Sequence, residues 1–353
     1  MGRNDKKYSL SLERQAYNKL ESMTCYKESK KEAKANGTMK YKIFSINTFK
    51  TYRKKINKFC KYIESKHPRC TTLDSAKKYV NEWLEYRKAL NLSAWTVQLD
   101  AKALGKLYCI SPGDDNYFKP PVRKRKDIKR SRYETKRSKL FSEKKHDKLV
   151  KYVKSTGERR EETEKAKPEY LMTKTEIEYE INYLSSQELT IPIINRLTIL
   201  KDTRYFNEEY YMYTKGKGGR ERISPIVGEY AEEVVEFIKN RKGNKYIFDE
   251  VSEYAPMHKY RSDYCNTVYK NYARKIEDIP KDKIRGGINQ MYQSEVYFCR
   301  NDRKKERFDT RALEICSKAL GHNRHEIVVN NYLRGLWYEL EKYSICKENS
   351  YWL

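Results

Sequence analysis

Residues 309–333, DTRALEICSKALGHNRHEIVVNNYL, decide how the C-terminal half of the chain is interpreted. The first twelve have helical periodicity, and Gly321 follows them, as expected because glycine is favoured just past a helix C-terminus. His322 lies in the next turn, and Tyr332 comes ten residues after it, on the following helix. The simpler interpretation is that Gly321 only caps the helix and that Tyr332 is one of 32 ordinary tyrosines. The alternative interpretation, which we favour, is that His322 donates to a phosphate oxygen near Tyr332.

Segment 156–162, TGERREE, is a further candidate motif. It is either an ordinary charged helix start or a buried turn that presents Arg159 to a phosphate. A guanidinium fork suits two phosphate oxygens, and Glu162 could hold that fork in place.

Two more motifs carry basic side chains. The strands expected at residues 210–214 and 222–227 flank a glycine-rich turn, which predicts a β-hairpin. Lys217 would lie at its tip, where a lysine can protonate a departing oxygen. In HKYR, His258 and Arg261 are spaced i and i+3, so a helix presents both on one face. A plain hairpin and a surface helix are the simpler interpretations of these two motifs.

The charge of the chain predicts an anionic partner. The 353 residues include 76 Lys and Arg against 49 Asp and Glu, a net charge of +27. Such an excess repels itself unless an anion is nearby, and a strongly basic domain is typical of nucleic-acid binding. A generally lysine-rich proteome is the alternative. We expect double-stranded DNA as the partner.

Residues 119–139 predict a basic linker between two domains. Eleven of these 21 residues are Lys or Arg, and Pro120 and Pro121 stop any preceding helix. Although a charge run is often only solvated, we expect this one to cross phosphates. The candidate DNA-binding residues are Arg123, Lys124, Arg125, Lys126, Lys129, Arg130 and Arg132.

Residues 41–118 predict a small helical domain. One helix face is formed by residues that recur at spacings of three and four, namely Phe49, Tyr52, Ile56, Phe59 and Ile63. Asn47 or Thr48 could cap this helix, and Ser93 could cap a later one. Residues 1–40 are expected to be a polar arm with a helix at about 12–33.

Several classes of protein are not expected. No apolar run approaches the roughly 20 residues of a membrane helix, and the N-terminus lacks the apolar segment of a secretory signal. The eight cysteines contain no CxxC pair and no His at ligand spacing, so we expect no metal, no cofactor and a reducing cytoplasm.

The candidate residues suit attack on a phosphodiester. Arg159, Arg261, His258 and His322 could supply positive charge where the transition state gathers negative charge. Tyrosine, with an ordinary pKa of about 10, is a poor nucleophile unless such charges and a base assist it. No acidic cluster resembles a two-metal nuclease site, which favours a metal-free reaction.

The order Arg, Lys, His-x-x-Arg, Gly-His, Tyr resembles the tyrosine recombinase (phage integrase) family over about residues 45–340. Residues 296–335 are most similar to integrases of conjugative and transposon-like mobile elements of Gram-positive bacteria. The resemblance implies cleavage by Tyr332, a 3′-phosphotyrosyl intermediate, protonation of the leaving 5′ oxygen by Lys217, and no ATP. It also implies a homotetramer on DNA in the bacterial nucleoid, integrating or excising a mobile element. An accessory excision factor is a possible partner.

The fold expected from this resemblance is mainly α with a small β component. It comprises a helical, SAM-like core-binding domain (41–118), the linker (119–140) and an α+β catalytic domain (141–353). The apolar tail, residues 333–353, could pack on its own domain or dock on a neighbouring protomer.

The chain departs from the family pattern at three places. Arg159 and Lys217 are 58 positions apart, which predicts an insertion at 172–209 and leaves Arg196 as a rival for the first arginine. Lys259 and Tyr260 occupy usually apolar positions, and Tyr332 comes one residue later than in many relatives.

The alternatives are a catalytically silent DNA-binding protein of this fold, and a DNA-end resolvase or type IB topoisomerase-like enzyme. A basic RNA-binding protein is disfavoured because no RNP-like motif is present.

Overall fold

The chain folds into two compact units, Met1–Lys129 and Arg130–Leu353. The structure is a computed structural model that describes residues 10–122, 140–216, 219–281, 294–300, 303–322, 324–333 and 335–336. The division between the units falls inside the predicted linker, 119–140. The predicted DNA-binding residues 123–132 and the tail beyond residue 336 lie outside the described residues.

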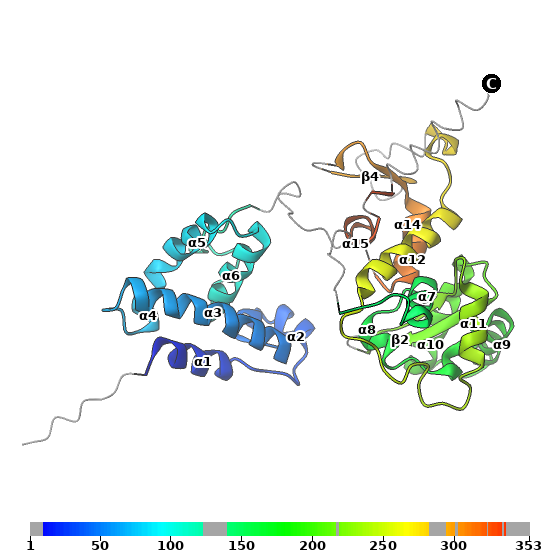
Figure 1. Ribbon diagram of the computed structural model, residues 1–353, viewed down its shortest axis with the longest axis horizontal. Coiled ribbons are helices and arrows are strands. Elements are labelled where there is room, and N and C mark those ends of the chain that lie inside the picture. The colour runs from blue at the N-terminus through cyan, green and yellow to red at the C-terminus, as the bar shows by residue number, and fades with distance from the viewer. Residues whose placement is uncertain are drawn as a thin grey trace, which may run out of the picture. The chain divides into compact units, whose positions relative to one another are not determined.

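The first unit is a bundle of helices (Figure 1). Its helices are α1 (Leu12–Ser22), α2 (Lys30–Ala35), η1 (Thr38–Tyr41), α3 (Ile46–Lys66), α4 (Leu73–Ala76), η2 (Lys77–Tyr79), α5 (Val80–Ala89) and α6 (Ala94–Leu107). Ile56, Phe59 and Ile63 of α3 are fully buried, as their spacing predicted. Ser93 caps α6 as expected. Ser45 caps α3 instead of Asn47 or Thr48, because its hydroxyl accepts from the Thr48 amide at 3.2 Å.

The N-terminal segment contributes to this core. Leu12, Ala16 and Leu20 of α1 are buried, and α1 packs on α3. The segment expected to be a polar arm over residues 1–40 is therefore, from Leu12 onward, part of the bundle. The segment is polar on average, so the single apolar residue in each helical turn was not recognised as part of a core.

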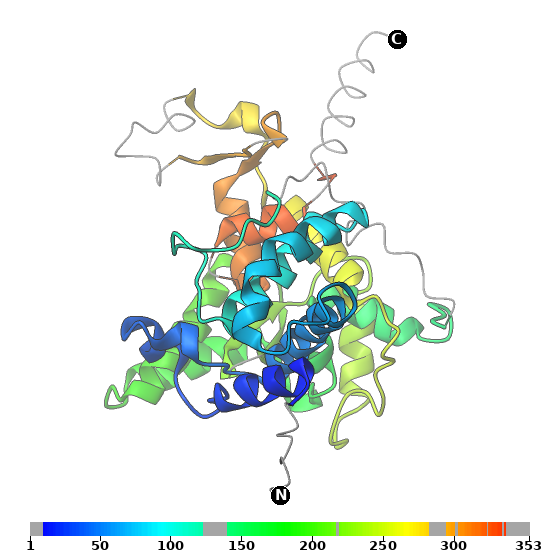
Figure 2. The ribbon, with the colours of Figure 1, turned by 90° about the vertical axis from the view of Figure 1, so that its left-hand side faces the viewer.

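The second unit combines helices with two small antiparallel sheets. Strands β1 (Leu171–Thr173), β2 (Tyr210–Lys215) and β3 (Glu221–Pro225) form a sheet in that order, with Met212 opposite Ser224. β4 (Val296–Phe298) pairs with β5 (Arg307–Asp309) where the chain enters α14 (Figure 2). The helices are α7 (Asp147–Thr156), α8 (Arg160–Thr163), α9 (Lys174–Ser185), α10 (Ile191–Lys201), α11 (Ala231–Lys239), α12 (Met257–Tyr272), α14 (Thr310–Ala319) and α15 (His325–Asn331).

The arrangement confirms the predicted fold class, mainly helical with small sheets. α12 packs on both α7 and α14, and α14 also contacts β3 and α15. This packing brings together the ends of α7, α12, α14 and α15, which carry the candidate catalytic residues. No helix in the described parts of the chain is long and apolar enough to cross a membrane.

Candidate active site

The turn after α7 presents Arg159. Gly157 ends α7 with φ +64°, and a Cβ there would lie 2.2 Å from a ring carbon of Tyr264. Only glycine fits this left-handed turn without displacing the buried ring. The backbone amide of Arg159 donates to Glu162 Oε2 at 2.8 Å, and the side-chain Nη1 of Arg159 donates to Glu162 Oε1 at 2.6 Å. The predicted support of Arg159 by Glu162 is therefore present.

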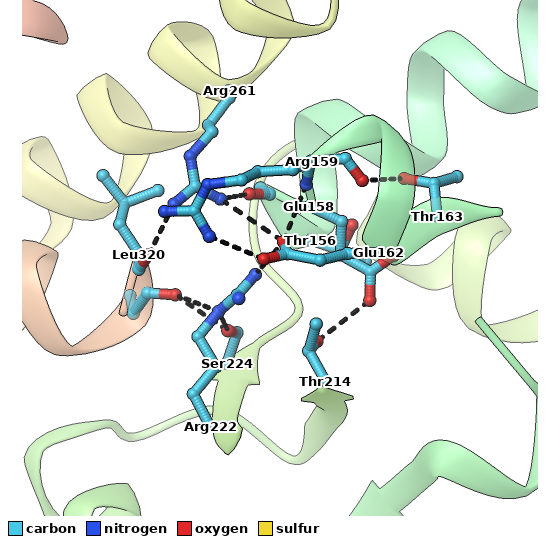
Figure 3. A network of polar contacts seen from close by, with 12 residues as sticks. Thr156, Glu158, Arg159, Glu162, Thr163, Thr214, Arg222, Ser224, Arg261 and Leu320 are labelled. Carbon is cyan, nitrogen blue, oxygen red and sulfur yellow. Dashed lines mark hydrogen bonds and ion pairs between the residues drawn. The ribbon is translucent and has the colours of Figure 1, made fainter. Parts of the chain in front are cut away.

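Glu162 is the centre of an arginine cluster (Figure 3). Besides Arg159, it accepts a hydrogen bond from Arg222 Nη2 at 2.9 Å, and Arg261 Nη1 lies 3.9 Å from the same carboxylate. Burial alone would raise the pKa of Glu162, but Arg222 and the other two arginines outweigh it and lower the pKa to about 2. The carboxylate thus stays ionised and holds three guanidinium groups together.

Arg261 connects this cluster to Tyr332. It is 1% exposed, and its Nη1 and Nη2 donate to the backbone carbonyls of Gly157 and Leu320. Its Nε lies 3.2 Å from the Tyr332 hydroxyl. Burial and then Arg222 lower the pKa of Arg261 to about 10, so it remains charged at neutral pH. A guanidinium has five N–H donors, so these three bonds use only part of its hydrogen-bonding capacity.

Tyr332 follows the last residue of α15 and is buried. Its hydroxyl also lies 3.3 Å from His322 Nε2. Burial, followed by the charges of Arg261, Arg159 and Arg222, lowers the pKa of His322 to about 3. At neutral pH the imidazole is therefore neutral, so its Nε2 can accept a hydrogen bond from the hydroxyl, but a pKa this low makes it a weak base. The positive charge comes from the arginines, whereas the sequence analysis assigned part of it to histidine.

Backbone contacts fix His322. Gly321, with φ +67°, ends α14 as expected, and the His322 amide donates to the Ser317 carbonyl at 2.7 Å. The Ser317 hydroxyl donates to the His322 carbonyl at 2.9 Å. The Gly-His turn thus places the imidazole beside Tyr332 through main-chain geometry.

Two further arginines, which were not among the residues predicted from the sequence, support the site. Arg222 on β3 is buried, and its Nε donates to Ser224 Oγ at 3.0 Å and to the Ala319 carbonyl at 3.2 Å. Arg303 pairs with Glu306, and its Nη1 donates to the Val329 carbonyl of α15 at 2.8 Å. The signal for Arg222 was its position as the charged residue of the strand predicted at 222–227, whose other residues are Ser224, Pro225 and three aliphatic residues.

The other candidates have different environments. Arg196 pairs with Glu180 on α9, through bonds of 2.7 and 2.8 Å, and its guanidinium stacks over Tyr213. Arg159, in contrast, shares Glu162 with Arg261, which favours it as the first arginine. His258 is exposed in the first turn of α12, three residues before Arg261. Lys217 lies outside the described residues, between β2 and β3.

A second carboxyl group, Glu158, lies in the same network. It is buried, and it accepts hydrogen bonds from Thr214 Oγ1 at 2.9 Å and from the Tyr152 hydroxyl at 3.1 Å. Burial raises the pKa of Glu158 to about 7, although Arg222 opposes this effect. Glu158 thus changes charge near neutral pH, whereas Glu162 does not.

This difference predicts how stability changes with pH. Because the pKa of Glu158 is raised on folding, its proton stabilises the folded state fully at acidic pH, and this contribution is lost as pH rises through about 7. The Glu158→Gln variant should lack this loss. Urea unfolding should therefore show the variant gaining stability relative to the wild type as pH rises from about 5 to about 8. A constant difference between the two proteins would contradict this assignment.

Comparisons with known proteins give fold-level similarities. No protein-family model and no curated protein matches the sequence. The chain is similar to XerH site-specific recombinase bound to difH substrate in a pre-cleavage complex, at 14% identity and a TM-score of 0.43, covering 94% of each chain. For XerH with a palindromic difH substrate, in a post-cleavage complex, identity is 13% and the TM-score 0.46, covering 95% of this chain and 94% of that one. For XerA recombinase the identity is 13% and the TM-score is 0.27, and the match covers 94% of this chain and 98% of that one. Values this low do not place the chain in a family.

Proposed function

We propose that this chain is a tyrosine-type site-specific DNA recombinase that cuts and rejoins DNA through Tyr332. The observation that carries the proposal is the position of the Tyr332 hydroxyl, 3.2 Å from Arg261 Nε and 3.3 Å from His322 Nε2. A nucleophile beside a neutral base and a guanidinium is the arrangement that covalent attack on a phosphodiester requires.

The charges of the cluster favour a bound phosphate. Arg159, Arg222 and Arg261 carry three positive charges, against Glu162 and the partly ionised Glu158. The Arg159 side chain is one-third exposed, unlike the buried Arg222 and Arg261. We propose that Arg159 and the remaining donors of Arg261 bind the non-bridging oxygens of the scissile phosphate. Both would then stabilise the charge that develops in the transition state.

The proposed reaction conserves the phosphodiester bond energy. The negative charge of a bound phosphate would raise the pKa of His322, which could then accept the hydroxyl proton as Tyr332 Oη attacks phosphorus and the bond to the 5′ oxygen breaks. Lys217, which the sequence predicts at the tip of the hairpin, would protonate that oxygen, leaving a 3′-phosphotyrosine and a free 5′-hydroxyl. A 5′-hydroxyl from a partner duplex then attacks the phosphotyrosine in reverse, so no ATP is consumed.

Duplex DNA of a mobile element is the proposed substrate, on the basis of the net charge of +27 and the predicted basic linker. The XerH structures hold difH substrates. Exchange between two duplexes needs four cuts and each chain has one Tyr332, so we propose a homotetramer on DNA. The apolar tail, residues 333–353, is a candidate joint between protomers.

The competing functions differ in their products. A catalytically silent DNA-binding protein would have no use for a buried Tyr332 hydroxyl held between His322 and Arg261. A topoisomerase-like enzyme would use the same cluster, and a supercoiled plasmid with two copies of the element's ends separates the two activities. A recombinase yields deletion or inversion products. Relaxation without any recombinant product would contradict the proposal.

The basic linker gives a prediction about salt dependence. Replacing Arg123, Lys124, Arg125 and Lys126 with Ala should weaken binding to all duplex sequences about equally. Each lost phosphate contact should reduce the slope of log K against log salt by about 0.9, because fewer counterions are released. Titrations across a salt series measure this slope. An unchanged slope would show that these residues are solvated and do not contact phosphates.

A further inference from the structure

The α9–α10 hairpin carries an unusual concentration of exposed apolar side chains. Tyr179 and Tyr183 lie one turn apart on α9, Leu189 lies in the connection, and Ile191 and Ile194 begin α10. All five are exposed, with Tyr179 at 73% and Ile191 at 76%. Elsewhere in the described part of the second unit, the exposed large apolar residues are the scattered Leu140, Tyr254 and Phe298. Concentrated apolar exposure of this kind marks interaction surfaces.

The hairpin is held rigidly from its other side. Ile177 of α9 and Leu200 of α10 are buried in the core of the second unit, together with Phe206 and Tyr211. The bidentate Arg196–Glu180 pair joins the two helices. The outward position of the apolar residues is thus fixed by packing, which lowers the entropic cost of binding a partner.

The charge of the same segment excludes DNA as its partner. Residues 175–195 contain four Glu and no Lys or Arg, the longest such interval in the sequence. Glu178 and Glu188 are exposed among the apolar residues. Phosphates would be repelled, whereas a surface that combines apolar and basic side chains would be attracted.

The first unit has a surface of this complementary kind, which we name the α2–η1 surface. We define it by the exposed apolar residues and exposed lysines of segment 26–46, namely Tyr26, Lys27, Lys30, Lys34, Met39, Tyr41 and Ile46. Residues 26–50 contain seven Lys against two Glu. We propose that the α9–α10 hairpin of one copy of the chain docks on the α2–η1 surface of a second copy. Such a contact is head-to-tail, because two different surfaces of the chain take part in it.

Charge reversal tests this contact without any need for catalysis. The hairpin variant carries Glu178→Lys and Glu188→Lys, and the surface variant carries Lys27→Glu and Lys30→Glu. The wild type should self-associate in sedimentation velocity at low salt, whereas each variant alone should be monomeric. An equimolar mixture of the two should associate again, because the unchanged hairpin of the surface variant meets the unchanged surface of the hairpin variant, and the basic hairpin also meets the acidic surface. A control with Glu236→Lys and Glu250→Lys adds the same charge on other exposed residues, and it should behave as the wild type.

The apolar component has its own variant. Tyr179→Ser with Ile191→Ser should also give a monomer, since both residues are exposed and their loss leaves the core intact. A monomeric wild type would overturn the proposal, as would variants that associate like the wild type or a mixture that stays monomeric. Tyr332→Phe should self-associate normally, so failure of the proposed catalysis and failure of this contact are distinguishable.

Discussion

The Tyr332→Phe protein should form no SDS-stable adduct with DNA while binding DNA nearly as tightly as the wild type. The change removes only the hydroxyl that lies beside Arg261 Nε and His322 Nε2. Losing it leaves the buried Arg261 and the half-buried His322 without this partner, at a cost of about 1–3 kcal/mol of stability. Unfolding measurements should therefore show a folded but somewhat less stable protein.

A second buried tyrosine supplies the control for this variant. Tyr269 is buried in the same core, and its hydroxyl accepts a hydrogen bond from the Asp309 amide at 2.8 Å. Tyr269→Phe should lose comparable stability and still form the adduct. If Tyr332→Phe forms an adduct, another tyrosine is the nucleophile.

Arg159→Ala should slow adduct formation by about 10² or more, equivalent to about 3 kcal/mol of transition-state stabilisation. Among the three arginines around Glu162, Arg159 has the most exposed side chain, so we expect it to contact the phosphate directly. Single-turnover rates at saturating protein measure the effect and separate it from weaker DNA binding.

Arg196→Ala is the matched control for the first arginine. It removes an arginine whose ion pair with Glu180 joins α9 to α10. It should therefore reduce stability modestly and leave the rate within a few-fold of the wild type. The reverse ordering of the two rates would move the active site to Arg196.

The sequence predicted those parts of the site that are locally encoded. Gly321 was recognisable because it follows a predicted helix, and Gly157 belongs to the candidate motif at 156–162; both have the positive φ of a helix C-terminus. Their turns present Arg159 and His322, so local spacing was sufficient to find both. The Arg159–Glu162 contact spans three residues and was equally predictable.

The tertiary part of the site could not be predicted. Arg222 contacts Glu162, 60 residues earlier, and the carbonyl of Ala319, 97 residues later. No periodicity encodes such contacts. The neutral state of His322 likewise depends on burial and on arginines that are distant in sequence, chiefly Arg261 of α12, Arg159 before α8 and Arg222 of β3. The burial of α1 was missed because Leu12, Ala16 and Leu20 are separated by polar residues.

Peptide mapping of the covalent adduct tests the central claim most directly. Wild-type protein would be incubated with a nicked suicide duplex that carries the element's ends, on which the cut strand diffuses away and religation fails. The adduct would then be digested and analysed by mass spectrometry. The account predicts a single modified peptide in which Tyr332 is joined to a 3′-phosphate, with a free 5′-hydroxyl on the released strand. A 5′-phosphate link, a different modified residue, or cleavage without any covalent adduct would contradict it.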